Sequence, residues 1–295
     1  MDTEKCRALL CTIETGSLSA AAEKLGYTPS GVSRMMAALE EQAGFPLLDR
    51  GRNGVTPTAD CRTLLPAIYD LVRQGDRVDQ MAAQIRGLET GQVIAGTAYN
   101  YYYRWLSHLI ADFGKAYPGI GVTLIEGTSS RLSRLAEERR ADFCIISKRE
   151  GSYRWLPLKD DPLVAWVPRD HPAAAKGVLP LEALRTEPFI EIYPGQETDN
   201  SRFFASQGFR PKVRYATSDT FAAYSMVAAG LGVTLVNSIF EDVWQGDVAA
   251  LPLDPPQYVS VGIALPAKEQ TPPAVSRFIE FASARLESAA GAGRA

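Results

Sequence analysis

Apolar residues recur every three or four positions in the N-terminal part of the chain, which is the spacing at which side chains share one face of an α-helix. Three such faces follow one another. They consist of Cys6, Leu9, Leu10 and Ile13, of Leu18, Ala21, Ala22 and Leu25, and of Val32, Met35, Met36 and Leu39. The pattern predicts three short amphipathic helices, the first of which covers the other two.

The second and third helices carry the signals of a tight connection. Ser17 or Ser19 can cap the start of the second helix, because a hydroxyl there accepts a hydrogen bond from a free backbone N–H. Gly26 suits its end, since glycine tolerates the left-handed conformation. Thr28 is the expected cap of the third helix, and Pro29 takes the first helical position, where its missing N–H costs nothing.

The third helix turns small polar side chains outward, namely Ser30, Ser33 and Arg34. A helix with such a face can lie in the major groove of DNA and reach base edges, with Thr28 and Pro29 close to the sugar–phosphate backbone. A generic small helical bundle is the alternative, because many helix pairs carry similar caps.

The next segment favours DNA binding over the generic bundle. Residues 45–58 resemble a short hairpin with Arg50 and Arg52 at its tip. A basic hairpin beside a recognition helix is a wing that meets phosphates or the minor groove. Arginines on loops are otherwise often plain solvated charge, but their place beside this helix pair favours the wing.

Residues 59–88 are predicted to form one long helix capped by Thr58. Two series recur every seven residues in it: Cys61, Ile68, Gly75 and Ala82, and Leu64, Leu71, Val78 and Ile85. Such a seam favours a helix-to-helix dimer contact, and a DNA reader needs two copies for two half-sites. The alternative is an amphipathic helix packed on its own domain, since Leu65 and Val72 widen the stripe.

From residue 91 onward, apolar strands alternate with helical segments. Strands are predicted at 93–98, 122–125, 143–146, 163–167, 189–192, 213–216, 233–236 and 259–265, and helices around 106–113, 132–135, 202–207, 220–229, 238–244 and 275–286. This repetition predicts a mostly parallel sheet divided into two lobes. Crossing segments near 160–163 and 264–268 would join the lobes as a hinged clamshell that binds ligands between its strand ends.

The expected fold class is therefore α+β with several domains. A winged helix-turn-helix domain spans 1–58, a linker and dimerisation helix spans 59–90, and a two-lobed α/β domain spans 91–295. We expect lobe I at about 91–162 and 266–290, and lobe II at about 163–265.

The run IETGSLSAAAEKLGYTPSGVSRMMAALEEQAGFPLLDR, residues 13–50, resembles the winged helix-turn-helix of the LysR-type transcriptional regulators. The residues that fit the family pattern are Gly16, Ser17, Ser19, Ala21, Ala22, Leu25, Ser30, Val32, Ser33, Leu39, Glu40, Leu47 and Arg50. Leu48 departs from the usual Phe, Asn53 from a common second wing arginine, and Asp60-Cys61 from Ala-Gly. The changes at Asn53 and Asp60 lower the positive charge near DNA, so we expect modest phosphate affinity.

Segments 113–132, 139–146 and 225–236 resemble the effector-binding domain of the same family, which itself resembles periplasmic solute-binding proteins. The resemblance implies a dimerising linker helix and a dimer of dimers. It also implies a cleft lined by Ala98, Tyr99 and Asn100, by Thr128 and Ser129, by Ser147, by Tyr193 and Gln196, and by Asp219, Thr220 and Asn237. Hydroxyls and amides at helix starts suit a carboxylate or another polar group of a small organic effector.

Aromatic residues crowd the first strand–helix junction, at Tyr99, Tyr101, Tyr102, Tyr103 and Trp105. A pocket there would favour an aromatic or flat effector through stacking, unless these rings pack in the core or in a subunit contact. Tyr99 is the best candidate for the cleft. Arg131 and Lys148 are the nearest cationic candidates, and the scarcity of such residues argues against a highly anionic effector.

Composition fits an intracellular regulator. A formal net charge of −3 leaves no global basic field, so DNA affinity must come from local placement and dimerisation. Cys6, Cys11, Cys61 and Cys144 lack metal spacing and are expected to be buried thiols. Because Cys144 is the only cysteine in residues 91–295, we expect no disulfide within the predicted α/β domain. No signal peptide or membrane-spanning run appears, so we expect a cytoplasmic protein without membrane contact.

Enzyme interpretations find no support in the residues. His108 and His171 are the only histidines, and neither lies near a nucleophile elbow or a cysteine partner. No phosphate loop, dinucleotide fingerprint or acidic metal cluster appears. We expect neither catalysis nor a cofactor.

The sequence thus predicts a sequence-specific DNA-binding transcriptional regulator whose activity is set by a small-molecule effector bound between two lobes. In addition to the residues of the third helix and the hairpin named above, Ser17 and Ser19 are expected at the DNA surface. Expected partners are double-stranded promoter DNA, the effector and further copies of the chain as a dimer or tetramer, with RNA polymerase as an additional candidate. The alternatives are a solute-binding or scavenging protein, and a regulator whose degenerate cleft responds to a partner.

Overall fold

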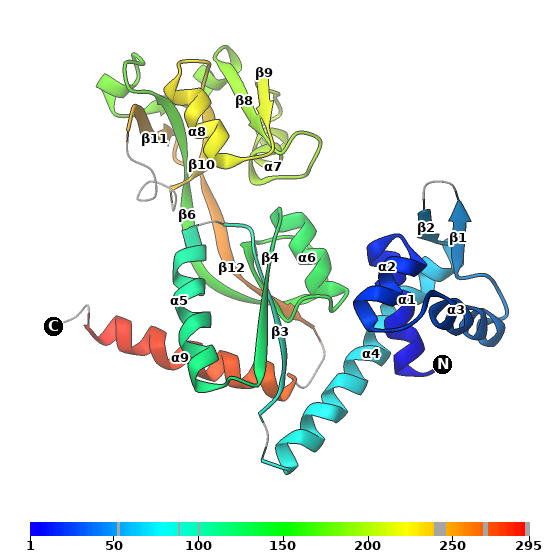
Figure 1. The fold of residues 1–295 in the computed structure, drawn as a ribbon. Coiled ribbons are helices and arrows are strands. Elements are labelled where there is room, and N and C mark those ends of the chain that lie inside the picture. The colour runs from blue at the N-terminus through cyan, green and yellow to red at the C-terminus, as the bar shows by residue number, and fades with distance from the viewer. Residues whose placement is uncertain (52–53, 88, 100, 239–245, 268–270, 293–295) are drawn as a thin grey trace.

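The computed structural model describes residues 1–51, 54–87, 89–99, 101–238, 246–267 and 271–292. Figure 1 shows a helical N-terminal domain, one long helix that leads away from it, and an α/β part with two lobes. The N-terminal domain consists of α1 (Thr3–Thr15), α2 (Leu18–Leu25), α3 (Pro29–Ala43), β1 (Leu48–Gly51) and β2 (Gly54–Pro57). The long helix is α4 (Ala59–Ile85).

The helix ends of the N-terminal domain lie where the local signals predict them. The side chain of Ser17 caps α2 and accepts a backbone hydrogen bond, and Gly26 ends α2 with a φ of 72°. Thr28 caps α3 in the same way, with Pro29 at the start of the helix. The apolar faces of the three helices meet in one core, which also takes in the start of the hairpin.

The long helix α4 uses its apolar positions in two different ways. Cys61 and Ile68 are buried in the core of the N-terminal domain. These two positions of the predicted dimer seam are therefore intramolecular contacts, because α4 covers α1 there. In the other series Leu64 also packs against this core, but Leu71 is 37 % exposed, Val78 64 % and Ile85 87 %. The described part of α4 therefore presents an exposed apolar stripe from Leu71 to Ile85, beside which Ala82 of the first series is also exposed.

The α/β part has two lobes joined by two long strands. Lobe I contains β3 (Gly91–Thr97), α5 (Tyr101–Ala116), β4 (Ile120–Glu126), α6 (Ser129–Glu137), β5 (Phe143–Ser147) and α9 (Pro273–Ala292). Lobe II contains β7 (Leu179–Pro180), β8 (Pro188–Ile192), α7 (Asp199–Ser206), β9 (Lys212–Thr217), α8 (Thr220–Ala228), β10 (Thr234–Asn237), β11 (Val248–Asp254) and the 3-10 turns Ala174–Lys176 and Leu181–Arg185. The strands that join them are β6 (Tyr153–Pro168) and β12 (Tyr258–Pro266), which lie side by side. All of the helix predicted at 238–244 except Ser238 lies outside the described residues.

The main sheet is mixed rather than mostly parallel as predicted. Parallel pairs join β3 to β4 and to β5, and β7 to β11, whereas the parallel pair of β8 and β9 forms a separate two-stranded sheet. However, β12 is antiparallel to β5 and β6, and β10 and β11 are antiparallel to β6. The local βαβ repetition could not reveal these pairs, because they join segments far apart in the sequence.

The two crossings between the lobes differ from expectation at one position. The first lies within β6, and Pro162 is paired there with Tyr258 at the start of β12. The second crossing was predicted at 264–268. By that point the chain already belongs to lobe I, because Val261 to Ala264 pair with β5. The strand predicted at 259–265 is confirmed as β12. Its pairing with β5 could not be predicted, because the residues of one strand do not specify which distant strand lies beside it.

Lobe I is also attached to α4. Arg139, just beyond α6, forms an ion pair with Asp70 of α4 at 2.9 Å. The guanidinium of the neighbouring Arg140 lies 5.1 Å from the ring centre of Tyr69, within the range of a cation–π contact. The C-terminal end of α6 therefore rests on the helix that leads to the N-terminal domain.

Candidate nucleic-acid interface and ligand pocket

The outward face of α3 is polar and open. Ser30 and Arg34 are exposed and Ser33 is half-buried. Arg34 has no acidic partner at ion-pair distance among the residues that the structure describes. In Figure 1, α3 and the β1–β2 hairpin lie on the side of the N-terminal domain that is turned away from the lobes. A guanidinium and two hydroxyls on one accessible helix face suit the donor and acceptor pattern of base edges.

Glu40 of α3 holds the hairpin in place. Its Oε1 accepts hydrogen bonds from the backbone N–H groups of Leu47 at 2.9 Å and Leu48 at 3.2 Å. Its Oε2 lies 3.8 Å from Nη2 of Arg50. One carboxylate thus fixes the hairpin strand and directs its arginine beside α3. Arg52 and Asn53, at the predicted tip of the wing, lie outside the described residues.

The serines predicted at the DNA surface from α2 have different surroundings. The Ser17 hydroxyl accepts a hydrogen bond from Ala20 N at 3.3 Å, so it is engaged in the helix cap. Ser19 is exposed in the first turn. Thr28 and Pro29 are exposed at the start of α3, where the Thr28 hydroxyl also lies 3.2 Å from that of Ser30.

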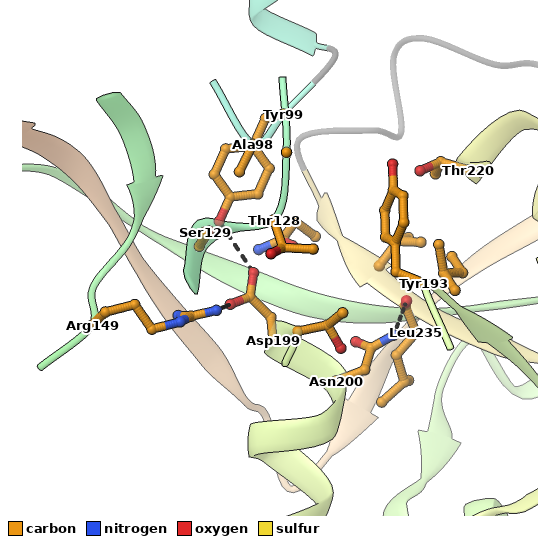
Figure 2. Close-up of a pocket in the computed structure, with 15 residues that line it drawn as sticks. Ala98, Tyr99, Thr128, Ser129, Arg149, Tyr193, Asp199, Asn200, Thr220 and Leu235 are labelled. Atoms are coloured by element: carbon orange, nitrogen blue, oxygen red, sulfur yellow. Dashed lines mark hydrogen bonds and ion pairs between the residues drawn. The ribbon is translucent and has the colours of Figure 1, made fainter. Parts of the chain in front are cut away.

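A pocket of about 90 Å³ lies between the two lobes (Figure 2). The predicted cleft residues that line it are Ala98, Tyr99, Thr128, Ser129, Tyr193, Thr220 and Asn237. Further lining residues, which the sequence did not indicate, are Gly127, Arg149, Ile192, Thr198, Asp199, Asn200, Leu235 and Val236. The predicted residue Ser147 does not line the pocket itself, because it is fully buried. It forms hydrogen bonds to two lining residues, Arg149 and Asp199.

An ion pair between the lobes forms one wall of the pocket. Arg149 follows β5 in lobe I, and its Nη2 lies 2.8 Å from Oδ1 of Asp199, in the first turn of α7 in lobe II. The Tyr99 hydroxyl donates to Oδ2 of Asp199 at 3.2 Å, and the Ser147 hydroxyl donates to Oδ1. Figure 2 shows Tyr99 and Arg149 converging on this carboxylate. All three donors belong to lobe I, and the acceptor belongs to lobe II.

Arg149 is held in lobe I by contacts of its own. Its Nε donates to Ser130 Oγ at 2.8 Å and its Nη1 to Ser147 Oγ at 2.6 Å. Its backbone N–H donates to the Tyr153 hydroxyl at 2.8 Å, and that hydroxyl donates to the Arg149 carbonyl. Only 5 % of the Arg149 side chain is exposed. The guanidinium is therefore positioned by lobe I alone.

Tyr99 lies in the pocket wall as a buried hydrogen-bond donor. It is 3 % exposed and packs with Leu106 and Ile145. Burial, reinforced by the nearby Asp199 charge, raises the pKa of its phenol well above the ordinary value, so the hydroxyl keeps its proton at neutral pH. Tyr99 lines the pocket as predicted, and stacking of an aromatic effector on its ring stays a prediction. The side chains at 101–105 lie outside the described residues.

The opposite part of the pocket offers polar groups with fewer contacts. Asn200 is engaged, since its Nδ2 donates to the Leu235 carbonyl at 2.8 Å. Asn237, at the end of β10, is 5 % exposed, and its Nδ2 has no hydrogen-bond partner among the described residues. Figure 2 shows Tyr193 and Thr220 across the pocket from Arg149. An unpartnered buried amide is costly, so Asn237 marks a place for an acceptor.

Several predicted residues lie elsewhere. Gln196 is exposed and does not line the pocket. Asp219 caps α8 instead, accepting from Ala222 N at 2.7 Å. Neither Arg131 nor Lys148 lines the pocket, and both side chains are exposed to solvent. Asn100 lies outside the described residues.

The sequence does carry signals for the two charged residues that were missed. Side chains two positions apart share one face of an extended chain. Arg149 therefore points the same way as the buried Ser147, while Lys148 between them turns to solvent. Asp199 follows Thr198, which forms a capping box with Ser201. That pattern places the start of α7 before the 202–207 predicted, and brings Asp199 into its first turn.

Other sites find little support. Among the residues that the structure describes, no group of His, Cys, Asp or Glu side chains is arranged to hold a metal ion. No described helix is both long enough and apolar enough to cross a bilayer. The four cysteines are buried and have free thiols, as predicted.

Comparison with known proteins gives two family matches. The family described as "Bacterial regulatory helix-turn-helix protein, lysR family" matches residues 3–62, and the "LysR substrate binding domain" family matches residues 86–287. The HTH-type transcriptional regulator YvbU of Bacillus subtilis (strain 168) is 28 % identical over 272 residues, which cover 91 % of this chain and 93 % of YvbU.

Solved structures share the fold. Full-length OxyR from Pseudomonas aeruginosa has a TM-score of 0.72 at 20 % identity. The match covers 95 % of this chain and 94 % of the OxyR chain. Full-length CbnR in complex with its target DNA has a TM-score of 0.60 at 21 % identity, with 95 % of this chain and 98 % of CbnR covered.

Proposed function

The chain belongs to the LysR family of bacterial transcriptional regulators, and on this premise we propose which of its residues bind DNA and which sense an effector. It is a DNA-binding transcriptional regulator with an effector-binding domain, and it self-associates. The observation that carries the assignment of residues is the accessible polar face of α3 beside a hairpin anchored to the same helix.

The DNA contacts are assigned by position. Ser30, Ser33 and Arg34 reach base edges in the major groove, with Thr28 and Pro29 close to the DNA backbone. CbnR, whose structure includes its target DNA, shares this fold and supports the assignment of the N-terminal domain to DNA.

The hairpin and α2 supply the remaining DNA contacts. Arg50 and Arg52 of the hairpin meet phosphates or the minor groove, and Ser17 and Ser19 lie at the same surface. Because the net charge is only −3, these local contacts and not a global field must supply the affinity.

Self-association rests on the open stripe of α4. Leu71, Val78 and Ile85 repeat every seven residues on one exposed face, and Met81 beside them is 46 % exposed. Such a stripe pairs with its copy on a second chain. Two copies place two α3 helices for two half-sites of an operator.

The effector site is the pocket between the lobes. It combines a buried cation, a carboxylate, hydroxyls and an unpartnered amide around a small cavity, which fits a small polar organic molecule. Binding there changes the relative position of the lobes, and this shifts the population of DNA-bound arrangements. The family consists of transcription regulators rather than enzymes, and we assign this chain a cytoplasmic, non-catalytic role.

A mobility-shift titration of the full-length protein on the DNA upstream of its own gene tests the proposal. We expect a shift by the wild-type protein, weaker binding and relaxed base preference for Arg34→Ala, and a shallower salt dependence without relaxed preference for Arg52→Ala. A scavenging protein would give no shift at all. A normal shift that neither variant alters would contradict the assignment of these residues.

The effector site needs a separate measurement. A thermal-shift screen of small carboxylic acids and aromatic compounds should give stabilisation by at least one of them, because a ligand that binds only the folded state raises its stability. No stabilisation by any compound would favour a regulator whose cleft responds to a partner instead.

A further inference from the structure

The carboxylate of Asp199 occupies a place that is built like a binding site for a free anion. Three donors from lobe I meet on it: the Tyr99 hydroxyl, the Ser147 hydroxyl and the Arg149 guanidinium. Both carboxylate oxygens are used, because Tyr99 donates to Oδ2 and the other two donors reach Oδ1. Hydrogen bonds between a guanidinium and a carboxylate are among the stronger ones in proteins.

The cation of this site does not depend on Asp199 for its position. Ser130 and Ser147 hold the guanidinium, and Tyr153 holds the backbone of Arg149 on both its N–H and its carbonyl. Lobe I therefore presents a preformed anion site. The anion, in contrast, arrives from lobe II on the first turn of α7, so it can leave when the lobes move apart.

A buried guanidinium without a counter-charge is strongly disfavoured. Whenever Asp199 withdraws, another anion must compensate Arg149 or water must enter the cleft. Beyond the carboxylate, the pocket continues as a small cavity toward the unpartnered Nδ2 of Asn237. A small molecule with one carboxylate and a second acceptor group can satisfy both ends.

We propose that Asp199 is an internal competitor of the effector: its carboxylate fills the subsite for the effector's carboxylate and thereby latches lobe I to lobe II. The proposal rests on the proposed function in taking this pocket as the effector site. An effector carboxylate takes over the three donors of Tyr99, Ser147 and Arg149, and Asp199 leaves with α7. Ligand binding and release of the latch are then one exchange of anions, with no change in the charge around Arg149.

Chemical complementation tests this exchange without knowledge of the natural effector. Asp199→Ala removes the internal carboxylate, and sodium acetate supplies the same group as a free ion. We expect acetate to raise the melting temperature of full-length Asp199→Ala in a saturable way, relative to sodium chloride of equal ionic strength. The apparent Kd for acetate should be at least about tenfold lower than that of the wild-type protein. Acetamide, which lacks the charge, should have no such effect.

Two control variants locate the acetate. Adding Arg149→Gln to Asp199→Ala should abolish the effect, because the cation of the subsite is gone. Glu182→Gln removes a lobe II carboxylate away from the pocket, whose partner is Arg185 at 2.6 Å, and it should respond to acetate as the wild type does. Equal responses of Asp199→Ala to acetate and chloride would overturn the proposal, and so would an acetate effect that persists without Arg149.

Two further measurements keep the result interpretable. If Asp199→Ala does not fold, Asp199→Asn keeps the side-chain shape, and acetate should still compete better against the neutral amide than against the wild-type carboxylate. Operator binding is measured on the same samples. Normal operator binding with no acetate effect contradicts the internal competitor alone, whereas a wild-type protein that binds no operator contradicts the proposed function.

Discussion

Arg73 of α4 forms an ion pair with Asp142 at the start of β5, with 2.8 Å between Nη2 and Oδ1. The Arg73 side chain is 18 % exposed and that of Asp142 9 %. Arg73 also donates to the Arg139 carbonyl, and Asp142 accepts from Ile94 N at 2.7 Å. The helix that leaves the DNA-binding domain is therefore bonded to the sheet of lobe I through a nearly buried pair.

Loss of Arg73 should destabilise the chain. Arg73→Ala leaves the Asp142 carboxylate buried without its cation, and we expect a loss of about 3 kcal/mol in the free energy of unfolding. Burial already raises the pKa of the Asp142 carboxyl despite the opposing effect of Arg73, so Asp142→Asn should cost less than Arg73→Ala. Urea unfolding checks both, with the exposed Arg62→Ala as a control expected within about 0.5 kcal/mol of wild type. Equal stability of Arg73→Ala and Arg62→Ala would contradict the prediction.

Glu40 should matter for DNA binding although it is not a DNA contact. Glu40→Ala removes the acceptor for Leu47 N and Leu48 N, and we expect a loss of about 1–3 kcal/mol in stability. Because the same carboxylate directs Arg50, operator affinity should fall too, as measured by fluorescence anisotropy. Glu41→Ala is the matched control, since this neighbouring carboxylate is exposed. Unchanged affinity of folded Glu40→Ala would show that the hairpin needs no such anchor.

The open stripe of α4 should carry the dimer contact. Val78→Asp places a charge in the middle of that stripe, at a side chain 64 % exposed in the single chain. We expect the dimer dissociation constant to rise by about tenfold or more, because charges are excluded from apolar interface cores. Sedimentation velocity measures this, with the exposed neighbour Asp79→Asn as the control. A dimer unaffected by Val78→Asp would move the interface away from this face.

The cysteines should be unreactive in the folded protein. Burial raises the pKa of the Cys144 thiol to about 12, so at pH 8 only about one molecule in ten thousand carries the thiolate there. We expect no alkylation of Cys144 by iodoacetamide in the native state and four alkylated thiols after denaturation. Mass spectrometry of the intact protein distinguishes the two. Rapid native labelling of Cys144 would indicate that β5 opens far more often than its burial implies.

Features that depend on near neighbours in sequence could be predicted, while features made by distant segments could not. The caps at Ser17, Thr28 and Pro29 follow from local backbone chemistry, and the structure has them where expected. Cys61 and Ile68 were placed in a dimer seam because the heptad spacing does not say which surface covers a helix face. The antiparallel partners of β12 depend on contacts with β5 and β6, which lie about a hundred residues earlier.

The same distinction applies to the pocket. Strand ends and helix starts bring Tyr99, Thr128 and Thr220 to one place, as the alternation of elements implies. Asp219 was expected beside them, but its side chain satisfies its own helix instead. The pairing of Arg149 with Asp199 joins residues of different lobes, and no spacing rule connects them.

The elements α6 and β5 join the pocket to the contacts of α4. Helix α6 starts at Ser129 in the pocket wall and ends near Arg139, which is paired with α4. Strand β5 starts after Asp142, which is also paired with α4, and ends at Ser147 beside the pocket. A helix of nine residues is about 13 Å long, so tilting α6 by about 5° at the pocket displaces its far end by roughly 1 Å. Helix α6 and strand β5 pack against each other, so a tilt or a shift of either element at the pocket would also move its end beside α4. We infer that these two elements form a short linkage through which the proposed exchange of one carboxylate would change the direction of the DNA-reading helix.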